Sequence, residues 1–93
     1  MILSDEPAVY VDGSYGIRTE NVIQVVPFTE TGYNSFYKFD TLTLVPIDTR
    51  AVDWNLLTPH QAQWLESYNK KVYESLKGLL SEQERQWLLT WSA

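Results

Sequence analysis

Apolar and polar positions follow two different patterns along the chain, and the change falls near Thr58. Before it, runs rich in β-branched residues alternate with most of the glycines and prolines, which is typical of strands and turns. Residues 15–28 (YGIRTENVIQVVPF) form the best strand pattern, with valine and isoleucine at both odd and even positions. Both faces are then apolar, as in a strand that is covered on both sides, which implies more protein around it.

A second strand pattern covers residues 36–47 (FYKFDTLTLVPI), where apolar and polar positions partly alternate. Residues 30–34 (ETGYN) lie between the two strands and have the composition of a turn. Together the two stretches predict a β-hairpin.

The residues after Thr58 have the spacing of helices. Thr58 and Gln61 form a capping box, and Pro59 takes the first helical position, where its missing N–H costs no hydrogen bond. One apolar stripe recurs at helical spacing and consists of Trp64, Leu65, Tyr68, Val72 and Leu76. Such a stripe is more often core than a ligand platform. Gly78 is placed to end this helix.

A second capping box, Ser81 with Glu84, opens a short helix that carries Trp87, Leu88 and Trp91 on one face. The chain is therefore expected to end in a helical hairpin.

Composition narrows the class of protein. The 93 residues are 44% hydrophobic and 14% aromatic, which favours packed structure over disorder. A net charge of −5 disfavours nucleic acid as a partner, because it repels a phosphate backbone. No apolar run approaches the roughly 18 residues that span a membrane, so no membrane association is expected. The chain has no cysteine, which permits a reducing cytoplasm and leaves only carboxylates or His60 as metal ligands.

Two glutamates stand out from this background. Glu6 directly precedes Pro7, and Glu20 lies in a strand pattern two positions after Arg18, so Arg18 and Glu20 project from the same face. A carboxylate in an apolar strand requires a charged partner or a metal ion. Spacing alone leaves two interpretations open: Glu20 pairs with Arg18 while Glu6 is a loop carboxylate, or both bind metal. His60, in the first turn of a helix, is expected to be solvated.

Three motifs carry a family resemblance. The run MILSDEPAVYVDGSYGIRTENVIQVV resembles the segment of Xaa-Pro aminopeptidases, pita-bread metallopeptidases, that contains an EPG motif followed by an IR-x-EN motif. TLTLVPIDTRAVDWNLLT and QWLESYNKKVYESL resemble the two stretches that follow in the same family. The motifs occur in family order and cover nearly the whole chain.

The resemblance implies roles for individual residues. Glu6 matches a terminal ligand of one metal ion and also accepts a proton from the attacking water, and Glu20 matches a carboxylate that bridges two ions. Arg18 matches an arginine that orients the bridging carboxylate. Tyr10 matches the tyrosine of the motif, and no catalytic role is assigned to it.

The implied chemistry is hydrolysis by two divalent ions about 3.5 Å apart, with Mn²⁺ suited to a carboxylate-rich site. The implied substrate is a peptide with proline at the second position, from which the first residue is removed. The other partners would be the remainder of the catalytic domain and a second copy of the chain.

The sequence departs from the family pattern in several places. The family also uses two aspartates and one histidine upstream of the EPG motif, and no residues here match them, so the isolated chain is expected to be inactive. Ala8 replaces the usual glycine and Asn69 the usual histidine. Two alternatives remain: a non-catalytic pita-bread module that binds other proteins, and a dimerisation element built on Trp87 and Trp91.

The fold expected is α+β, namely the carboxyl-terminal portion of a pita-bread domain with antiparallel strands followed by a helical hairpin. Residues 1–57 would be the strand-rich end of the catalytic domain, and residues 58–93 a carboxyl-terminal helical extension.

Overall fold

The computed structural model describes residues 1–92, which divide into two compact units, one from Met1 to Thr43 and the other from Leu44 onward. The first unit contains only strands and turns, and the second contains the helices. This is the α+β composition that the sequence predicts.

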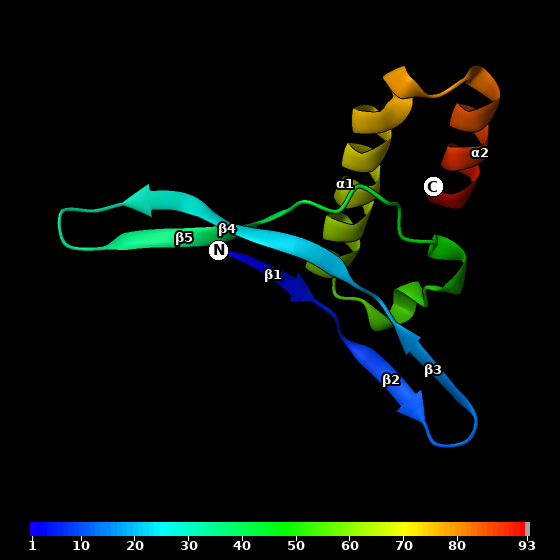
Figure 1. Ribbon diagram of the computed structural model, residues 1–93, viewed down its shortest axis with the longest axis horizontal. Helices are drawn as coiled ribbons and strands as arrows, with labels where there is room; N and C mark the ends of the chain where they lie inside the picture. The colour runs from blue at the N-terminus through cyan, green and yellow to red at the C-terminus, as the bar shows by residue number, and fades with distance from the viewer. Residues whose placement is uncertain (93) are drawn as a thin grey trace. The chain divides into compact units, whose positions relative to one another are not determined.

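Five antiparallel strands make up the first unit. In chain order they are β1 (Ile2–Asp5), β2 (Ala8–Val11), β3 (Tyr15–Arg18), β4 (Asn21–Glu30) and β5 (Ser35–Thr41). The strand order β1-β4-β5 forms a three-stranded sheet, and β2 and β3 form a separate two-stranded ladder. In Figure 1, β2 continues from β1 and β3 leads into β4, so the four strands make two arms of one long hairpin.

The expected strand over residues 15–28 is therefore two strands, interrupted at Thr19 and Glu20. The strand expected over residues 36–47 is observed as the shorter strand β5, which ends at Thr41. The hairpin between them is confirmed: the Thr31 N–H donates to the Asn34 carbonyl at 2.7 Å. Strands β1 and β2 were not specified by the sequence pattern.

A tight turn joins β2 to β3. Gly13 has a φ of 68°, a left-handed conformation that residues with a side chain adopt at a cost. The N–H of Ser14 donates to the Val11 carbonyl at 3.0 Å and closes the turn. Val11 then pairs with Tyr15, and the register of the hairpin runs outward from this point.

The second unit begins with residues 44–48 and two short 3₁₀ turns, η1 (Thr49–Ala51) and η2 (Trp54–Leu56). The helix α1 (Pro59–Leu76) follows, then a further 3₁₀ turn η3 (Lys77–Leu79) and the helix α2 (Glu82–Ser92). Both predicted capping boxes are present. The Thr58 N–H donates to Gln61 Oε1 at 2.9 Å, and the Ser81 N–H donates to Glu84 Oε1 at 2.9 Å.

The predicted helix end is nearly correct, but its mechanism is different. The α-helix stops at Leu76 and the chain makes one 3₁₀ turn that includes Gly78. Gly78 does not adopt the left-handed conformation, which among the glycines is found at Gly13. The tightening of the last turn, rather than a glycine cap, satisfies the final carbonyl groups.

The core of the second unit lies on the predicted stripe of α1. Among the residues whose side chains are described, the buried apolar ones are Leu65, Tyr68, Val72 and Leu88. Trp64 is half exposed and stacks on Tyr68, with ring centroids 5.3 Å apart. Trp87 is 61% exposed, and the side chain of Trp91 lies outside the described residues.

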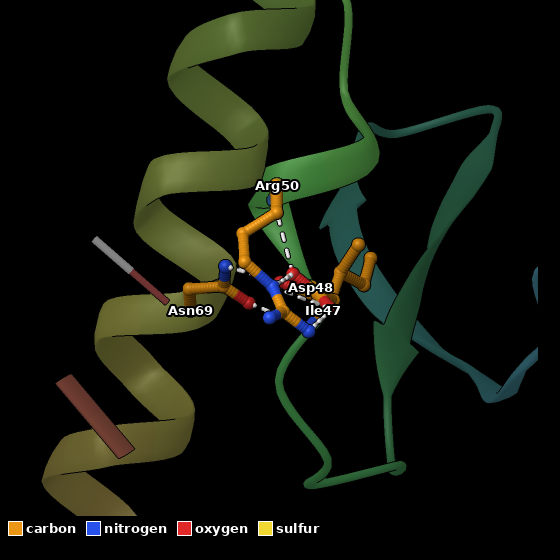
Figure 2. Close-up of polar contacts among 4 residues, drawn as sticks. All are labelled: Ile47, Asp48, Arg50 and Asn69. Carbon is orange, nitrogen blue, oxygen red and sulfur yellow. Dashed lines mark hydrogen bonds and ion pairs between the residues drawn. The ribbon is translucent and has the colours of Figure 1, made fainter. Parts of the chain in front are cut away.

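Among the side chains described in this unit, one polar side chain is buried. Asn69 is 2% exposed and bonds to the backbone of Ile47 in both directions: the Ile47 N–H donates to Oδ1 at 2.9 Å, and Nδ2 donates to the Ile47 carbonyl at 3.0 Å. Figure 2 shows this amide of α1 beside the Asp48–Arg50 ion pair. The phenol of Tyr68 donates to the Val45 carbonyl at 2.9 Å. The helix thus supplies the hydrogen bonds that a neighbouring strand would otherwise give to residues 45–47.

None of the helices in residues 1–92 is long and apolar enough to cross a membrane.

Candidate metal centre

The two candidate carboxylates lie at the point where the long hairpin is interrupted. Glu6 stands between β1 and β2, and Glu20 between β3 and β4. Asp5 pairs with Asn21 on one side of the interruption, and Ala8 pairs with Arg18 on the other. Counting inward from either pair places Glu6 opposite Glu20, so the register is continuous through the gap.

Proline explains why the ladder is interrupted here. In the same register Pro7 lies opposite Thr19, and the N–H of Thr19 donates to the Pro7 carbonyl at 3.2 Å. Pro7 has no N–H with which to return a second bond to Thr19. One rung of the ladder is therefore missing, although the two arms stay in register.

The hydrogen bond at Pro7 also fixes how Glu6 faces Glu20. Hydrogen-bonded and non-hydrogen-bonded pairs alternate along an antiparallel ladder, so Glu6 and Glu20 form a pair without backbone hydrogen bonds. In such pairs the α-carbons lie about 4.5 Å apart and both side chains project from one face. Two carboxylates directly opposite each other repel, and a cation between them relieves the repulsion.

Arg18 already supplies one positive charge at this position. Its Nε lies 3.3 Å from Glu20 Oε2, with the two side chains 51% and 39% exposed. The prediction that Arg18 and Glu20 share a face is confirmed by this ion pair. The simpler interpretation of Glu20, as the partner of Arg18, therefore describes one part of the site.

The side chains present suit a metal ion as one part of its ligand set. Carboxylate oxygens are the donors that hard divalent cations prefer. Within residues 1–92, no group of three or more His, Cys, Asp and Glu side chains is close enough to hold a metal ion. A metal site that used Glu6 and Glu20 would need further ligands from outside these residues.

Two further residues considered from the sequence have clear positions. His60 is exposed in the first turn of α1, as expected, and belongs to the helical unit. Tyr10 lies opposite Gly16 in the hairpin and is 68% exposed. A Cβ at position 16 would be 2.6 Å from Tyr10 Cδ1, so the ring lies directly over the glycine.

The sequence contains a signal for the hairpin of β2 and β3. Asp12-Gly13 is a strong hairpin turn signal, and residues 8–11 (AVYV) before it have high β-propensity. A two-residue turn at Asp12-Gly13 would have placed Glu6 opposite Thr19, whereas the observed three-residue turn, across which Val11 pairs with Tyr15, places it opposite Glu20.

Comparison with known proteins places this arrangement in a family. Residues 35–91 match the family described as the C-terminal region of peptidase M24. The chain belongs to this family. Relatives named Xaa-Pro aminopeptidase match most of the length of the chain. They confirm the resemblance to this family that the three motifs suggest.

The M24 relatives include enzymes from fungi and plants. A probable Xaa-Pro aminopeptidase P of Tuber melanosporum is 38% identical over an alignment of 85 positions, which covers 88% of this chain and 14% of the relative. Aminopeptidase P1 of Lotus japonicus is 37% identical over an alignment of 93 positions, which covers 95% of this chain and 14% of the relative. The chain thus spans about one seventh of the length of these proteins.

A solved structure shows the same arrangement of elements. The X-prolyl aminopeptidase of Caenorhabditis elegans, described as a cytosolic enzyme with a di-nuclear active site, matches 99% of this chain with a TM-score of 0.83 and 34% identity. The match covers 16% of the worm protein. The predicted fold class, the carboxyl-terminal portion of such an enzyme, is confirmed. The metal roles of Glu6 and Glu20 and the orienting role of Arg18 stay predictions.

Proposed function

We propose that this chain is the carboxyl-terminal part of the catalytic domain of an aminopeptidase that uses two divalent metal ions to remove the first residue from peptides with proline at the second position. The observation that carries the proposal is the register of the interrupted hairpin, which sets Glu6 directly opposite Glu20. The family match and the di-nuclear site of the worm relative support it.

In this proposal each residue of the hairpin has a separate task. Glu20 would hold both ions, and Glu6 would hold one of them from the opposite strand. Arg18 lies beside Glu20 and orients its carboxylate through the ion pair. When bound, a pair of divalent ions lowers the pKa of a water molecule and polarises the peptide carbonyl. Glu6 accepts the proton that the attacking water gives up.

The finer assignments follow from chemistry and from the relatives. Mn²⁺ is the proposed metal, because a site rich in carboxylates favours hard ions. The cytoplasm is the proposed location, since the worm enzyme is described as cytosolic and this chain has no cysteine. A homo-oligomer is proposed because Trp87 is exposed. Residues 1–57 are proposed as the strand-rich end of the catalytic domain, and residues 58–93 as its helical extension.

The test uses a longer protein that joins this chain to an upstream catalytic half taken from a relative. In the presence of Mn²⁺ this protein should hydrolyse a peptide with proline at the second position. Glu20→Gln should reduce kcat/KM by at least about a hundredfold, because it removes a proposed metal ligand. The 93-residue chain alone should show no hydrolysis.

The matched control is Glu66→Gln, which makes the same change at an exposed position of α1. It should leave kcat/KM unchanged. Full activity of the Glu20→Gln protein would show that the ligand assignment is wrong. A longer protein that binds the peptide without cleaving it would favour the non-catalytic binding module instead.

A further inference from the structure

The ladder between β4 and β5 ends on a side chain, two residues from Glu20. Just past the end of β5, the Leu42 N–H donates to the Val22 carbonyl at 2.8 Å. In a regular antiparallel ladder the Val22 N–H would donate back to the Leu42 carbonyl. Here it donates to the side-chain oxygen of Thr43, Oγ1, at 2.7 Å. A threonine hydroxyl therefore completes the ladder where a backbone carbonyl is expected.

The hydroxyl takes this place where the backbone leaves the sheet. Thr43 is the last residue of the first unit, and the carbonyl of Val45, two residues later, accepts from the phenol of Tyr68. A hydroxyl carries lone pairs that accept as a carbonyl does, and it stands off the backbone on its own side chain. Thr43 thus still holds the Val22 N–H after the backbone ladder has ended.

Val22 connects this hydrogen bond to Glu20. The two residues are two positions apart on one arm, so their side chains project from the same face. Their backbone groups also point toward the same edge, because Glu20 and Glu6 form a pair without backbone hydrogen bonds. On the Glu6 side, the neighbouring rung lacks its return bond because of Pro7. The opposite edge, where Thr43 holds Val22, therefore has a larger share in fixing the backbone that carries Glu20.

We propose that Thr43 is a positioning residue for Glu20. Its hydroxyl fixes the backbone at Val22 and so sets the direction in which the Glu20 side chain projects. Arg18 has the complementary task, since its ion pair orients the carboxylate at the end of that side chain. The inference rests on the proposed function, because it takes Glu20 to be a carboxylate that would hold metal. Small displacements matter in such a site, where reacting groups must be held to within about 1 Å.

The first experiment uses the longer protein that joins this chain to an upstream catalytic half. Thr43→Val keeps the branching and size of the side chain but removes the oxygen that accepts from Val22. It should raise the Mn²⁺ concentration for half-maximal activity about tenfold, the size of effect that residues supporting a metal ligand have. A mere loss of folded protein would lower the activity without changing that concentration. The KM for the peptide should change by less than about twofold, because the substitution acts through Glu20.

Two further variants separate the hydroxyl from the rest of the side chain. Thr43→Ser returns the oxygen and should restore the Mn²⁺ requirement to within about threefold of the unaltered protein. The matched control is Thr29→Val, which makes the same change at an exposed position near the other end of β4. It should leave the Mn²⁺ requirement unchanged.

The second experiment measures hydrogen exchange of single backbone amides and does not depend on activity. In the unaltered protein the Val22 amide should be about as well protected as that of Gln24, which pairs with Asp40 inside the ladder. In Thr43→Val the Val22 amide should exchange about fivefold faster, the change expected from the loss of one hydrogen bond of typical strength. The Gln24 amide should keep its rate and serves as an internal reference.

The outcomes separate the two proposals. A longer protein that is inactive, or whose activity survives Glu20→Gln, would overturn the proposed function and this inference with it. Activity that depends on Glu20, with the same Mn²⁺ requirement in Thr43→Val, would overturn the inference alone. So would a Thr43→Ser protein that behaves like Thr43→Val, since the hydroxyl would then have no part in the effect. An unprotected Val22 amide in the unaltered protein would overturn it even if no variant folded.

Discussion

The amide of Asn69 gives the sharpest stability prediction. Asn69→Ala removes two hydrogen bonds, at 2.9 and 3.0 Å, and leaves the N–H and carbonyl of Ile47 without partners. Each bond contributes about 1 kcal/mol, and burial adds a further penalty for the groups left behind. Ile47 is half-buried, so water satisfies part of this loss. The free energy of unfolding should fall by about 2–3 kcal/mol.

The measurement is urea unfolding of the chain followed by circular dichroism at 222 nm, a signal that comes from the helices. The control is Asn55→Ala, which truncates an exposed asparagine of η2 and should change stability by less than about 0.5 kcal/mol. A loss below that value for Asn69→Ala would refute the argument that α1 holds residues 45–47 through this side chain.

A second substitution tests the hydrogen bond that Nδ2 of Asn69 donates to the Ile47 carbonyl. Asn69→Asp keeps the oxygen that accepts from Ile47 but turns an oxygen toward the Ile47 carbonyl in place of Nδ2. Burial and the facing carbonyl should raise the pKa of that carboxyl above its unfolded value. The variant should therefore gain stability as the pH falls, because the protonated acid can donate again. Equal instability at every pH would show that the lost bond to the carbonyl is not the cause.

The remaining predictions concern the hairpin and α2. Gly16→Ala should destabilise the first unit by about 1 kcal/mol, because the new Cβ forces the Tyr10 ring from its rotamer. In a double-mutant cycle, the same change in a Tyr10→Ala background should cost no stability. Equal losses of stability in both backgrounds would contradict this explanation. The capping-box hydrogen bond from the Ser81 N–H lowers the pKa of Glu84 in the folded chain. The stability that this bond gives α2 should be complete above the pKa that Glu84 has in the unfolded chain. It should be lost as the pH falls through the lower pKa of the folded chain. Glu84→Gln should keep the cap and remove this acid dependence, which helix content measured from pH 7 to pH 2 would show.

The local signals in the sequence predicted the helical unit well, because helix starts depend on a few neighbouring residues. Thr58 with Gln61, and Ser81 with Glu84, form the expected capping boxes. The end of α1 was less accurate, since a 3₁₀ turn at Lys77–Leu79 replaced the expected glycine cap. The last turn of a helix is often 3₁₀, and helix ends vary by one or two residues, so a sequence pattern places them only approximately.

The site was partly predictable, and the missing part was long-range pairing. The shared face of Arg18 and Glu20 followed from strand alternation and is confirmed by their ion pair. The strand of Glu6 was not specified, so its position opposite Glu20 emerged only from the register. Asn69 was noted as a departure from the family, but its two bonds to Ile47 join residues 22 positions apart and have no local signature.

The turn at Gly13 sets the geometry of the two carboxylates from a distance. Glu6 lies seven residues before this glycine and Glu20 seven residues after it, so the arms of the hairpin have equal length. Adding one residue to a single arm would turn the two glutamates to opposite faces, since side chains alternate along a strand. Adding one residue to both arms would keep them opposed. The metal pair proposed above therefore requires that any change of length in this hairpin be symmetric about the turn.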